Sequence, residues 1–347
     1  MKALRLALAG AGVIGRAHAE RMRSQAQCVL AGVADPTPEA AAFAQAMGVP
    51  HFTTLNALLE ATQPDGAILA TPNALHVPGA LACLARRVPV LVEKPIADTL
   101  DEAHVLVAAA ATSGVPVLVG HHRRHSALLQ AARAVIESGQ LGRLVSVNGS
   151  ATFRKPDSYF TEAPWRAQPG GGPILINLVH EIDNLRMLLG EIVEVQALAS
   201  NAARGGAVED TVAISLRFAN GVLGSFLLSD SAASPRSWEQ TSGENTRYDR
   251  HTDEDCYVIA GDAGSLEVPT MRLRRYAGER SWWEPLVTET LAVPALDPLQ
   301  RQLDHFCAVI RGEETPLVSA ADAARTLEVT LAVGRAAASH QALRLAA

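Results

Sequence analysis

Residues 4–15 read L-R-L-A-L-A-G-A-G-V-I-G, a short apolar run followed by three closely spaced glycines. The apolar run, Leu4–Ala9, has the length and composition of a buried β-strand. It leads into Gly10-Ala11-Gly12-Val13-Ile14-Gly15, which fits G-x-G-x-x-G and opens a helical pattern. In this context the first glycine allows a tight turn, the second lets a pyrophosphate approach the backbone, and the third lets helix and strand pack closely. We therefore predict a dinucleotide site at the N-terminus of the helix.

Short apolar runs and Ala-rich amphipathic runs alternate through residues 1–120. Strands this short and apolar fit a sheet covered on both faces, and the helices between them supply the crossovers for parallel pairing. The expected strands are Leu4–Ala9, Val29–Ala34, Gly66–Ala70, Val90–Val92 and Val117–Val119. The expected helices are Val13–Ala26, Glu39–Met47, Asn73–Ala85 and Leu100–Thr112. The alternation predicts an α/β fold with a doubly wound parallel sheet, a Rossmann domain spanning residues 1–120.

The pattern changes after Gly120, where strand-like runs begin to follow one another. We expect helices at Ser126–Ser138, Ile174–Leu189, Pro298–Ile310 and Ala320–His340. We expect strands at Leu144–Thr152, Val193–Ala199, Ala207–Phe218, Val222–Ser229 and Asp255–Ala260, with hairpin signals at Asn220-Gly221 and Asp262-Ala263-Gly264. Residues 231–255 are polar and predict a long loop. Residues 121–347 should therefore form an α+β domain with a large, mostly antiparallel open sheet.

The composition narrows the class of protein. The chain has 347 residues, which suggests about two domains. Lys and Arg total 30 against 36 Asp and Glu, and this balance of −6 argues against a general nucleic-acid binder. No apolar stretch approaches the roughly 18 residues of a membrane span. The first residues could be read as a signal peptide, but Arg5 interrupts their apolar run, so we expect a strand. Four cysteines without C-x-x-C spacing favour buried thiols in a reducing cytoplasm.

Asp35 ends the second expected strand, twenty residues after Gly15. A carboxylate at this position accepts hydrogen bonds from the ribose hydroxyls of adenosine and repels a 2′-phosphate. Pro36 and Thr37 follow it, and neither offers such a phosphate a positive charge. NAD(H) is therefore favoured over NADP(H) as the cofactor. Asp35 could also cap the helix near Glu39, and the two roles are compatible.

Lysine is rare in this chain. Only Lys2, Lys94 and Lys155 occur among 30 basic side chains, so arginine serves almost wherever a positive charge suffices. Lys94 stands in Glu93-Lys94-Pro95 at the carboxyl end of an expected parallel strand, where open α/β sheets place their ligands. A desolvated lysine beside a cationic nicotinamide can lose its proton, which arginine cannot do. Lys94 is thus a catalytic candidate, and an ion pair with Glu93 is the structural alternative.

These elements resemble the Gfo/Idh/MocA oxidoreductase family, which includes glucose–fructose oxidoreductase and inositol dehydrogenase. The resemblance spans essentially the whole chain and rests on the glycine loop, Asp35, Thr71-Pro72-Asn73 with His76, Glu93-Lys94-Pro95, Gly170-Gly171-Gly172, and His180 with Asp183. It implies that Lys94 contacts the nicotinamide and the reacting hydroxyl. It also implies that Thr71, Pro72, Asn73, His76 and Glu93 lie at the cofactor and that Trp165-Arg166 lines it. By the same resemblance, residues 121–347 form the domain that binds substrate, and its open sheet often serves oligomerisation.

His180 is the second catalytic candidate, because an imidazole on a helix after a glycine triplet can exchange a hydroxyl proton near neutral pH. The structural alternative is a packed core histidine. Many members of the family carry Asp four residues earlier, where this chain has Ile176. Asn177, three residues before His180, shares its helix face but supplies no charge. Asp183, one turn after His180, is a possible partner.

The run His121-His122-Arg123-Arg124-His125 suggests a ligand site. Two guanidinium groups among the imidazoles disfavour a metal ion, so we expect no metal here. An anionic or polyhydroxylated ligand fits better, with His122 and Arg123 nearest by family register. Trp238 could stack on a sugar or cyclitol ring, although packing is an equal alternative.

The residues and the resemblance together predict an NAD-dependent dehydrogenase for a secondary alcohol of a sugar, cyclitol or related polyol. Dihydrodiol or imine oxidoreduction within the same family, or a non-catalytic regulator that senses a dinucleotide, are the alternatives. The pair Lys94 and His180 speaks against a pure sensor. Val212, Ile214 and Leu216 fall on one side of their strand, while Val222–Ser229 is apolar on both. We therefore expect the second sheet face to be buried in a homo-dimer or homo-tetramer.

Overall fold

The computed structural model describes residues 2–346, which form two compact units. The first unit runs up to His122 and also includes Pro298–Leu327. The second runs from Arg123 to Asp297 and resumes at Glu328. Each unit is treated by itself below.

The sheet of the first unit is parallel throughout, with the order β3-β2-β1-β4-β5-β6. This is the order of a doubly wound dinucleotide-binding fold, so the predicted Rossmann architecture is confirmed. The buried run Leu4–Ala9 forms a central strand, as expected. The strands are β1 (Leu4–Ala9), β2 (Cys28–Ala34), β3 (His51–Phe52), β4 (Gly66–Leu69), β5 (Val90–Glu93) and β6 (Val117–Gly120).

Polar caps fix where several helices of this unit begin. The hydroxyl of Thr37 accepts from the N–H of Ala40 at the start of α2, and Thr99 with Glu102 forms a capping box on α5. Thr37 rather than Asp35 therefore caps α2. The helices are α1 (Val13–Arg23), α2 (Pro38–Met47), α3 (Leu55–Thr62), α4 (His76–Ala85), α5 (Leu100–Ser113) and α10 (Pro298–Ile310), with the 3₁₀ turn η1 (Asn73–Leu75). A second 3₁₀ turn, η2 (His122–His125), begins at the last residue of the first segment of this unit and continues into the second unit.

Helix α10 lies in the first unit, although the sequence predicted it in a second domain starting at residue 121. Its residues Leu303, Phe306 and Cys307 are fully buried in the same apolar cluster as Leu6 and Leu8 of β1. The burial of this apolar stripe against the sheet, rather than distance along the chain, determines its unit.

The second unit contains a nine-stranded sheet of the order β14-β13-β12-β11-β7-β10-β9-β8-β15. Every pair is antiparallel except β7 with β10, so the predicted mostly antiparallel sheet is confirmed. Asn220-Gly221 joins β9 and β10 as an antiparallel hairpin, as expected. The strands are β7 (Leu144–Thr152), β8 (Ile192–Ser200), β9 (Thr211–Phe218), β10 (Leu223–Ser229), β11 (Tyr257–Gly261), β12 (Gly264–Val268), β13 (Arg272–Tyr276), β14 (Leu286–Thr290) and β15 (Leu343–Arg344).

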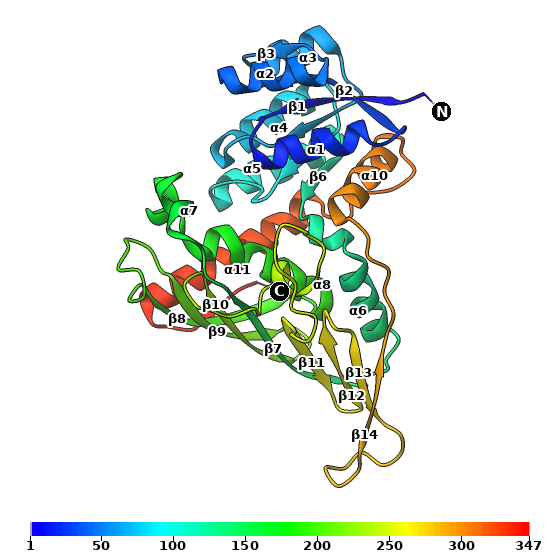
Figure 1. Ribbon diagram of the computed structural model, residues 1–347, viewed down its shortest axis with the longest axis vertical. Helices are drawn as coiled ribbons and strands as arrows, with labels where there is room; N and C mark the ends of the chain where they lie inside the picture. The colour runs from blue at the N-terminus through cyan, green and yellow to red at the C-terminus, as the bar shows by residue number, and fades with distance from the viewer. Residues whose placement is uncertain (1, 347) are drawn as a thin grey trace. The chain divides into compact units, whose positions relative to one another are not determined.

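Helices cover one face of this sheet, as Figure 1 shows for α8 and α11. Buried and exposed residues alternate along β9, with Val212, Ile214 and Leu216 facing the helices. On the opposite face, Leu198 keeps 67% of its surface exposed and Leu227 keeps 46%. The helical elements are α6 (Ala127–Glu137), α7 (Asp157–Thr161), η3 (Pro164–Ala167), the π-helical turn η4 (Ile174–Leu178), α8 (Val179–Leu189), α9 (Trp238–Thr241) and α11 (Ala320–Ser339), of which α11 belongs to this unit from Glu328 on.

Within residues 2–346 no helix combines the length and apolar character that crossing a bilayer requires.

We predict that Gly15→Ala destabilises the protein, because a β-carbon there would lie 2.0 Å from the carbonyl oxygen of Gly10. Forced overpacking of this kind costs about 1–3 kcal/mol or more in the free energy of unfolding. Chemical denaturation followed by circular dichroism measures the change. Gly12→Ala is the matched control, since no atom lies within 4 Å of its β-carbon position. Equal stability of the two variants would contradict the close-packing role of Gly15.

Candidate active-site residues

The glycine loop between β1 and α1 has no room for side chains at its first and third glycines. Gly10 has φ +90°, and a β-carbon on it would lie 2.3 Å from the carbonyl oxygen of Ala70. Gly12 borders open space, Val13 is 77% exposed and Ile14 is half-buried. No side chain caps the N-terminus of α1, so its N–H groups face outward at the loop. This geometry fits a dinucleotide pyrophosphate.

The carboxylate of Asp35 is held beside the same loop. Its Oδ2 accepts from the N–H of Ala11 at 2.9 Å, and its Oδ1 accepts from the N–H and hydroxyl of Thr37 at 2.9 and 2.7 Å. Burial raises the pKa of Asp35, but these hydrogen bonds outweigh it and hold that pKa below its usual value. A fixed, ionised carboxylate suits ribose hydroxyls and opposes a 2′-phosphate.

His76 braces the loops that follow β4 and β5. Its Nδ1 lies 2.7 Å from the carbonyl oxygen of Pro95, and its Nε2 lies 3.0 Å from that of Thr71. The ring is buried, whereas Thr71 and Asn73 are half-buried and Pro72 is exposed. His76 therefore positions the Thr71–Asn73 turn rather than facing a ligand itself.

Glu93 is buried beneath Lys94. Its Oε1 lies 2.7 Å from Nε2 of His18 on α1, and its Oε2 accepts from the N–H of Lys94 at 3.4 Å. Burial raises the pKa of Glu93, but His18, together with the charges of His122 and Lys94, keeps it below its usual value. The buried anion anchors β5 to α1, and the half-buried Lys94 follows at the end of the strand.

In the second unit, the glycine triplet packs under the Trp165-Arg166 turn. A β-carbon on Gly171 would lie 2.6 Å from the carbonyl oxygens of both Trp165 and Arg166. Trp165 is exposed, and the guanidinium of Arg166 lies 3.9 Å from the ring centre of Tyr159. An exposed indole beside a stacked guanidinium offers a surface for a planar ring or a phosphate, and its contact with cofactor stays a prediction.

A π-helical turn, η4, leads from the triplet into α8. Such turns are rare and occur frequently at functional sites. Ile176, Asn177 and His180 are half-buried on this segment, while neighbouring Leu178 and Val179 are buried. His180 is thus partly accessible on the side that also carries Asn177.

Lys155 is a functional candidate that sequence reasoning missed. Its Nζ donates to Oδ1 of Asn177 at 2.7 Å and lies 3.4 Å from Oδ2 of the buried Asp230. Burial lowers the pKa of Lys155 to about 8, although Asp230 opposes the shift. The scarcity of lysine that singled out Lys94 applies equally to Lys155 and could have found it.

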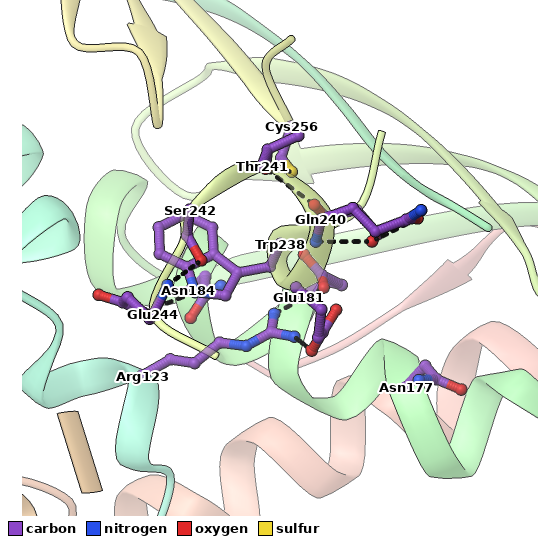
Figure 2. Close-up of polar contacts among 12 residues, drawn as sticks. Arg123, Asn177, Glu181, Asn184, Trp238, Gln240, Thr241, Ser242, Glu244 and Cys256 are labelled. Carbon is purple, nitrogen blue, oxygen red and sulfur yellow. Dashed lines mark hydrogen bonds and ion pairs between the residues drawn. The ribbon is translucent and has the colours of Figure 1, made fainter. Parts of the chain in front are cut away.

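Arg123 belongs to a buried charged cluster (Figure 2). Its guanidinium donates to Glu181 of α8 at 2.7 Å and to Glu239 of α9 at 2.5 Å. The hydroxyl of Tyr257 donates to the other oxygen of Glu181. Burial raises the pKa of Glu181, and Arg123 opposes that rise. The structure therefore brings Arg123 to two carboxylates, and a direct contact with substrate stays a prediction.

The remaining candidates are placed as follows. Asp183 is buried, and its two oxygens accept from Arg124 at 2.7 and 2.8 Å. Trp238 is only 3% exposed and donates its indole N–H to Glu244 at 2.9 Å. The indole of Trp238 is thus packed in the interior, and its stacking on a substrate ring stays a prediction. His122 is half-buried.

Two family models match the chain, and together they cover most of it. Residues 4–121 match "Oxidoreductase family, NAD-binding Rossmann fold", and residues 129–267 match the "GFO/IDH/MocA C-terminal domain". The residues carrying the first match include the glycine loop and Asp35, so the cofactor is NAD.

Several known proteins are similar over long stretches. The 1,5-anhydro-D-fructose reductase of Ensifer adhaerens is 28% identical over 345 residues, which is 98% of each chain. Inositol 2-dehydrogenase 4 of Saccharopolyspora erythraea is 32% identical over 227 residues, 63% of this chain and 65% of that one. The WlbA dehydrogenase of Bordetella pertussis, solved with NADH and UDP-GlcNAcA, superposes with a TM-score of 0.79 at 25% identity over 99% of both chains.

We predict that the protein binds NADH about 10–100-fold more tightly than NADPH, because hydrogen bonds to the Asp35 carboxylate are exchanged for repulsion of the 2′-phosphate. Asp35→Ser should weaken NADH binding and bring the two dissociation constants close together. Fluorescence titration measures both. Asp101→Ser, which removes an exposed carboxylate of α5, is the control. Equal affinity of the unaltered protein for the two cofactors would remove Asp35 from this role.

Proposed function

Because this chain belongs to the GFO/IDH/MocA family of NAD-binding oxidoreductases, we propose that it interconverts a secondary alcohol and a ketone on a sugar, cyclitol or related polyol. One observation carries the proposal. Strands β1, β4 and β5 are adjacent and parallel, so the glycine loop, Thr71 and Lys94 follow their carboxyl ends at one edge of the sheet. Ligands of open α/β sheets bind at this edge.

The residues present fit NAD. Gly10, Gly12 and the start of α1 would hold the pyrophosphate, Asp35 would hold the adenosine ribose, and Thr71–Asn73 would border the nicotinamide half. NAD, when bound, supplies the hydride acceptor. Glu93 and His76, which sit below this edge, keep the two loops in place.

Lys94 and His180 are the groups to which we assign the chemistry. An ammonium at Lys94 stabilises negative charge as it develops on the substrate oxygen. An imidazole at His180 takes the hydroxyl proton in oxidation and returns it in reduction. Asn177, on the accessible side of the same helical segment, positions the substrate through its amide.

The substrate class rests on the relatives. Their names point to anhydrofructose, inositol and a nucleotide-linked sugar derivative, all of which carry a ring with several hydroxyl groups. His122 and the Arg123 and Trp238 region are the proposed substrate side. A cytoplasmic location is part of the proposal, since all four cysteines are buried free thiols, the state that a reducing compartment maintains.

A homo-dimer or homo-tetramer is also part of the proposal. The uncovered face of the second sheet exposes Leu198, Leu227 and Val258, and it surrounds a hollow of about 900 Å³. The face carries these exposed apolar side chains among small polar ones such as Ser215 and Ser225, and exposed apolar residues gathered on an uncovered sheet face mark a contact surface. A second copy of the same face would bury it with two-fold symmetry.

Lys94→Met and His180→Ala should each lower kcat by about 10²–10⁴-fold, because charge stabilisation and proton exchange act mainly in the transition state. NADH affinity should stay nearly unchanged in both. Steady-state kinetics and fluorescence titration separate the two effects, and Arg86→Met at the exposed end of α4 controls for lost charge. If both variants keep near-normal kcat on the true substrate, the assignment is wrong.

The oligomer is tested by light scattering at micromolar concentration. The unaltered protein should run as a multiple of 36.6 kDa, whereas Leu198→Arg with Leu227→Arg should give the 36.6 kDa monomer, because two charges then face the interface. Val105→Arg, on the exposed side of α5, is the control. A single 36.6 kDa species for the unaltered protein would rule the interface out.

A further inference from the structure

Lys155 and Asn177 form a polar pair on the accessible side of the helix that carries His180. Lys155 lies shortly after β7, and its Nζ reaches Oδ1 of Asn177 at 2.7 Å. Asn177 precedes His180 by three residues, so the two lie about one helical turn apart. The Lys155 side chain is 10% exposed and Asn177 is half-buried, so neither is sealed in the core.

The chemistry of lysine fixes the orientation of the Asn177 amide. An ammonium has three donors and no acceptor, so the group facing it must be the amide oxygen. The NH₂ group of Asn177 consequently faces away from Lys155. Together the two side chains present N–H donors to their surroundings, and the apolar Ile176 beside them adds no acceptor.

The charge around this pair is positive. Arg204 and Arg166 both act on Lys155, and the carboxylate facing them is Asp230. Asp230 is 1% exposed, and its Oδ1 accepts from Arg204 at 2.6 Å, while Lys155 lies 3.4 Å from Oδ2. The single carboxylate of Asp230 is thus shared between Lys155 and Arg204. Burial is the main reason that the pKa of Lys155 falls to about 8, and repulsion from Arg204 and Arg166 adds to it.

Aromatic rings shape the remaining sides. The Nζ of Lys155 lies 4.6 Å from the ring centre of Tyr159 and 5.6 Å from that of Phe153. These rings restrict the directions open to the ammonium and exclude water from part of its surface. A donor-only, positively charged and partly desolvated corner suits a small anion with several acceptor atoms.

We propose that Lys155 and Asn177 form a subsite for a carboxylate of the substrate, so that the polyol oxidised by this protein is a sugar acid or polyol acid. The inference rests on the proposed function, since it places this carboxylate beside the carbon whose hydroxyl proton His180 exchanges. Lys155 binds the anion directly, and Asn177 donates its amide to a second acceptor oxygen.

Matched pairs of compounds test the subsite. D-glucuronate and D-glucose differ only in a carboxylate that replaces a CH₂OH group, as do D-gluconate and D-sorbitol. Calorimetric titration into the NADH-loaded protein at pH 7 should show the acid binding about 10–100-fold more tightly than its neutral partner in at least one pair. Lys155→Met and Asn177→Asp should each abolish that preference. Arg133→Met, an exposed charge on α6, should leave it intact.

The preference should also depend on pH. Lys155 is charged below about pH 8 and neutral above it, so the ratio of kcat/KM for the acid to kcat/KM for its neutral partner should fall as pH rises through 8. The ratio cancels the titration of Lys94 and His180, which act on both compounds. Lys155→Arg should move this fall to higher pH, because arginine stays protonated. The charged groups that act on Lys155, namely Asp230, Arg204 and Arg166, are unchanged in this comparison. The phenol of Tyr159, whose ring faces Lys155, has its pKa raised by burial and stays neutral through pH 8.

Several results would overturn the subsite. One is equal binding of acid and neutral partner in both pairs; another is an equal loss for both in Lys155→Met. Weaker NADH binding by Lys155→Met without sugar would assign the charge to the cofactor phosphates instead. If the acids bind preferentially but no compound reduces NAD⁺, the subsite stands and the proposed oxidoreduction fails.

Discussion

The close approach of two backbone segments at Gly10 and Gly15 is the constraint on which the first unit depends. A β-carbon at either position would overlap a carbonyl oxygen, so α1 can start on the end of β1 only because both side chains are missing. That start turns the N–H groups of α1 toward the edge where β4 and β5 also end. The buried contact of His18 with Glu93 then fixes α1 to β5. It thereby holds Lys94, the next residue, in place at the end of that strand. The proposed cofactor site and the proposed catalytic lysine follow from one packing arrangement.

The second unit is organised by buried charge. Arg123 and Arg124 are consecutive, yet each meets carboxylates of α8 in the interior, Glu181 and Asp183 respectively. Removing one partner from such a pair leaves an uncompensated buried charge and typically costs about 3–5 kcal/mol. These ion pairs orient α8, and thereby the side on which His180 lies. The carboxylates that compensate Arg123, Glu181 and Glu239, lie 58 and 116 residues further along the chain, so the sequence could not show these pairs.

The sequence predicted helices and strands well where the spacing of apolar residues and the flanking turn residues indicate the same element. Leu4–Ala9 and Leu144–Thr152 form strands with the predicted bounds. The two-residue strand β3 was missed because His51–Phe52 is too short to show an alternating hydrophobic pattern. Helix α3, which follows it, was missed as well. Strands β12 to β14 were missed for another reason: they are held by cross-strand pairs such as Arg272 and Arg274 with Glu267, which become visible only in three dimensions. Lys155 escaped notice because its partner Asn177 lies on a different element.

Helix α10 has a consequence for biosynthesis. Its side chains Leu303, Phe306 and Cys307 complete the core under β1, yet they are made long after β6 has left the ribosome. Domains generally fold as units while the chain is still growing. Here an apolar face of the Rossmann sheet stays uncovered until α10 has been translated, after all the strands of the second unit from β7 to β14. The nascent chain is therefore a natural client for chaperones that shield hydrophobic surface, and a premature stop anywhere in the second unit would leave an incomplete, aggregation-prone first unit.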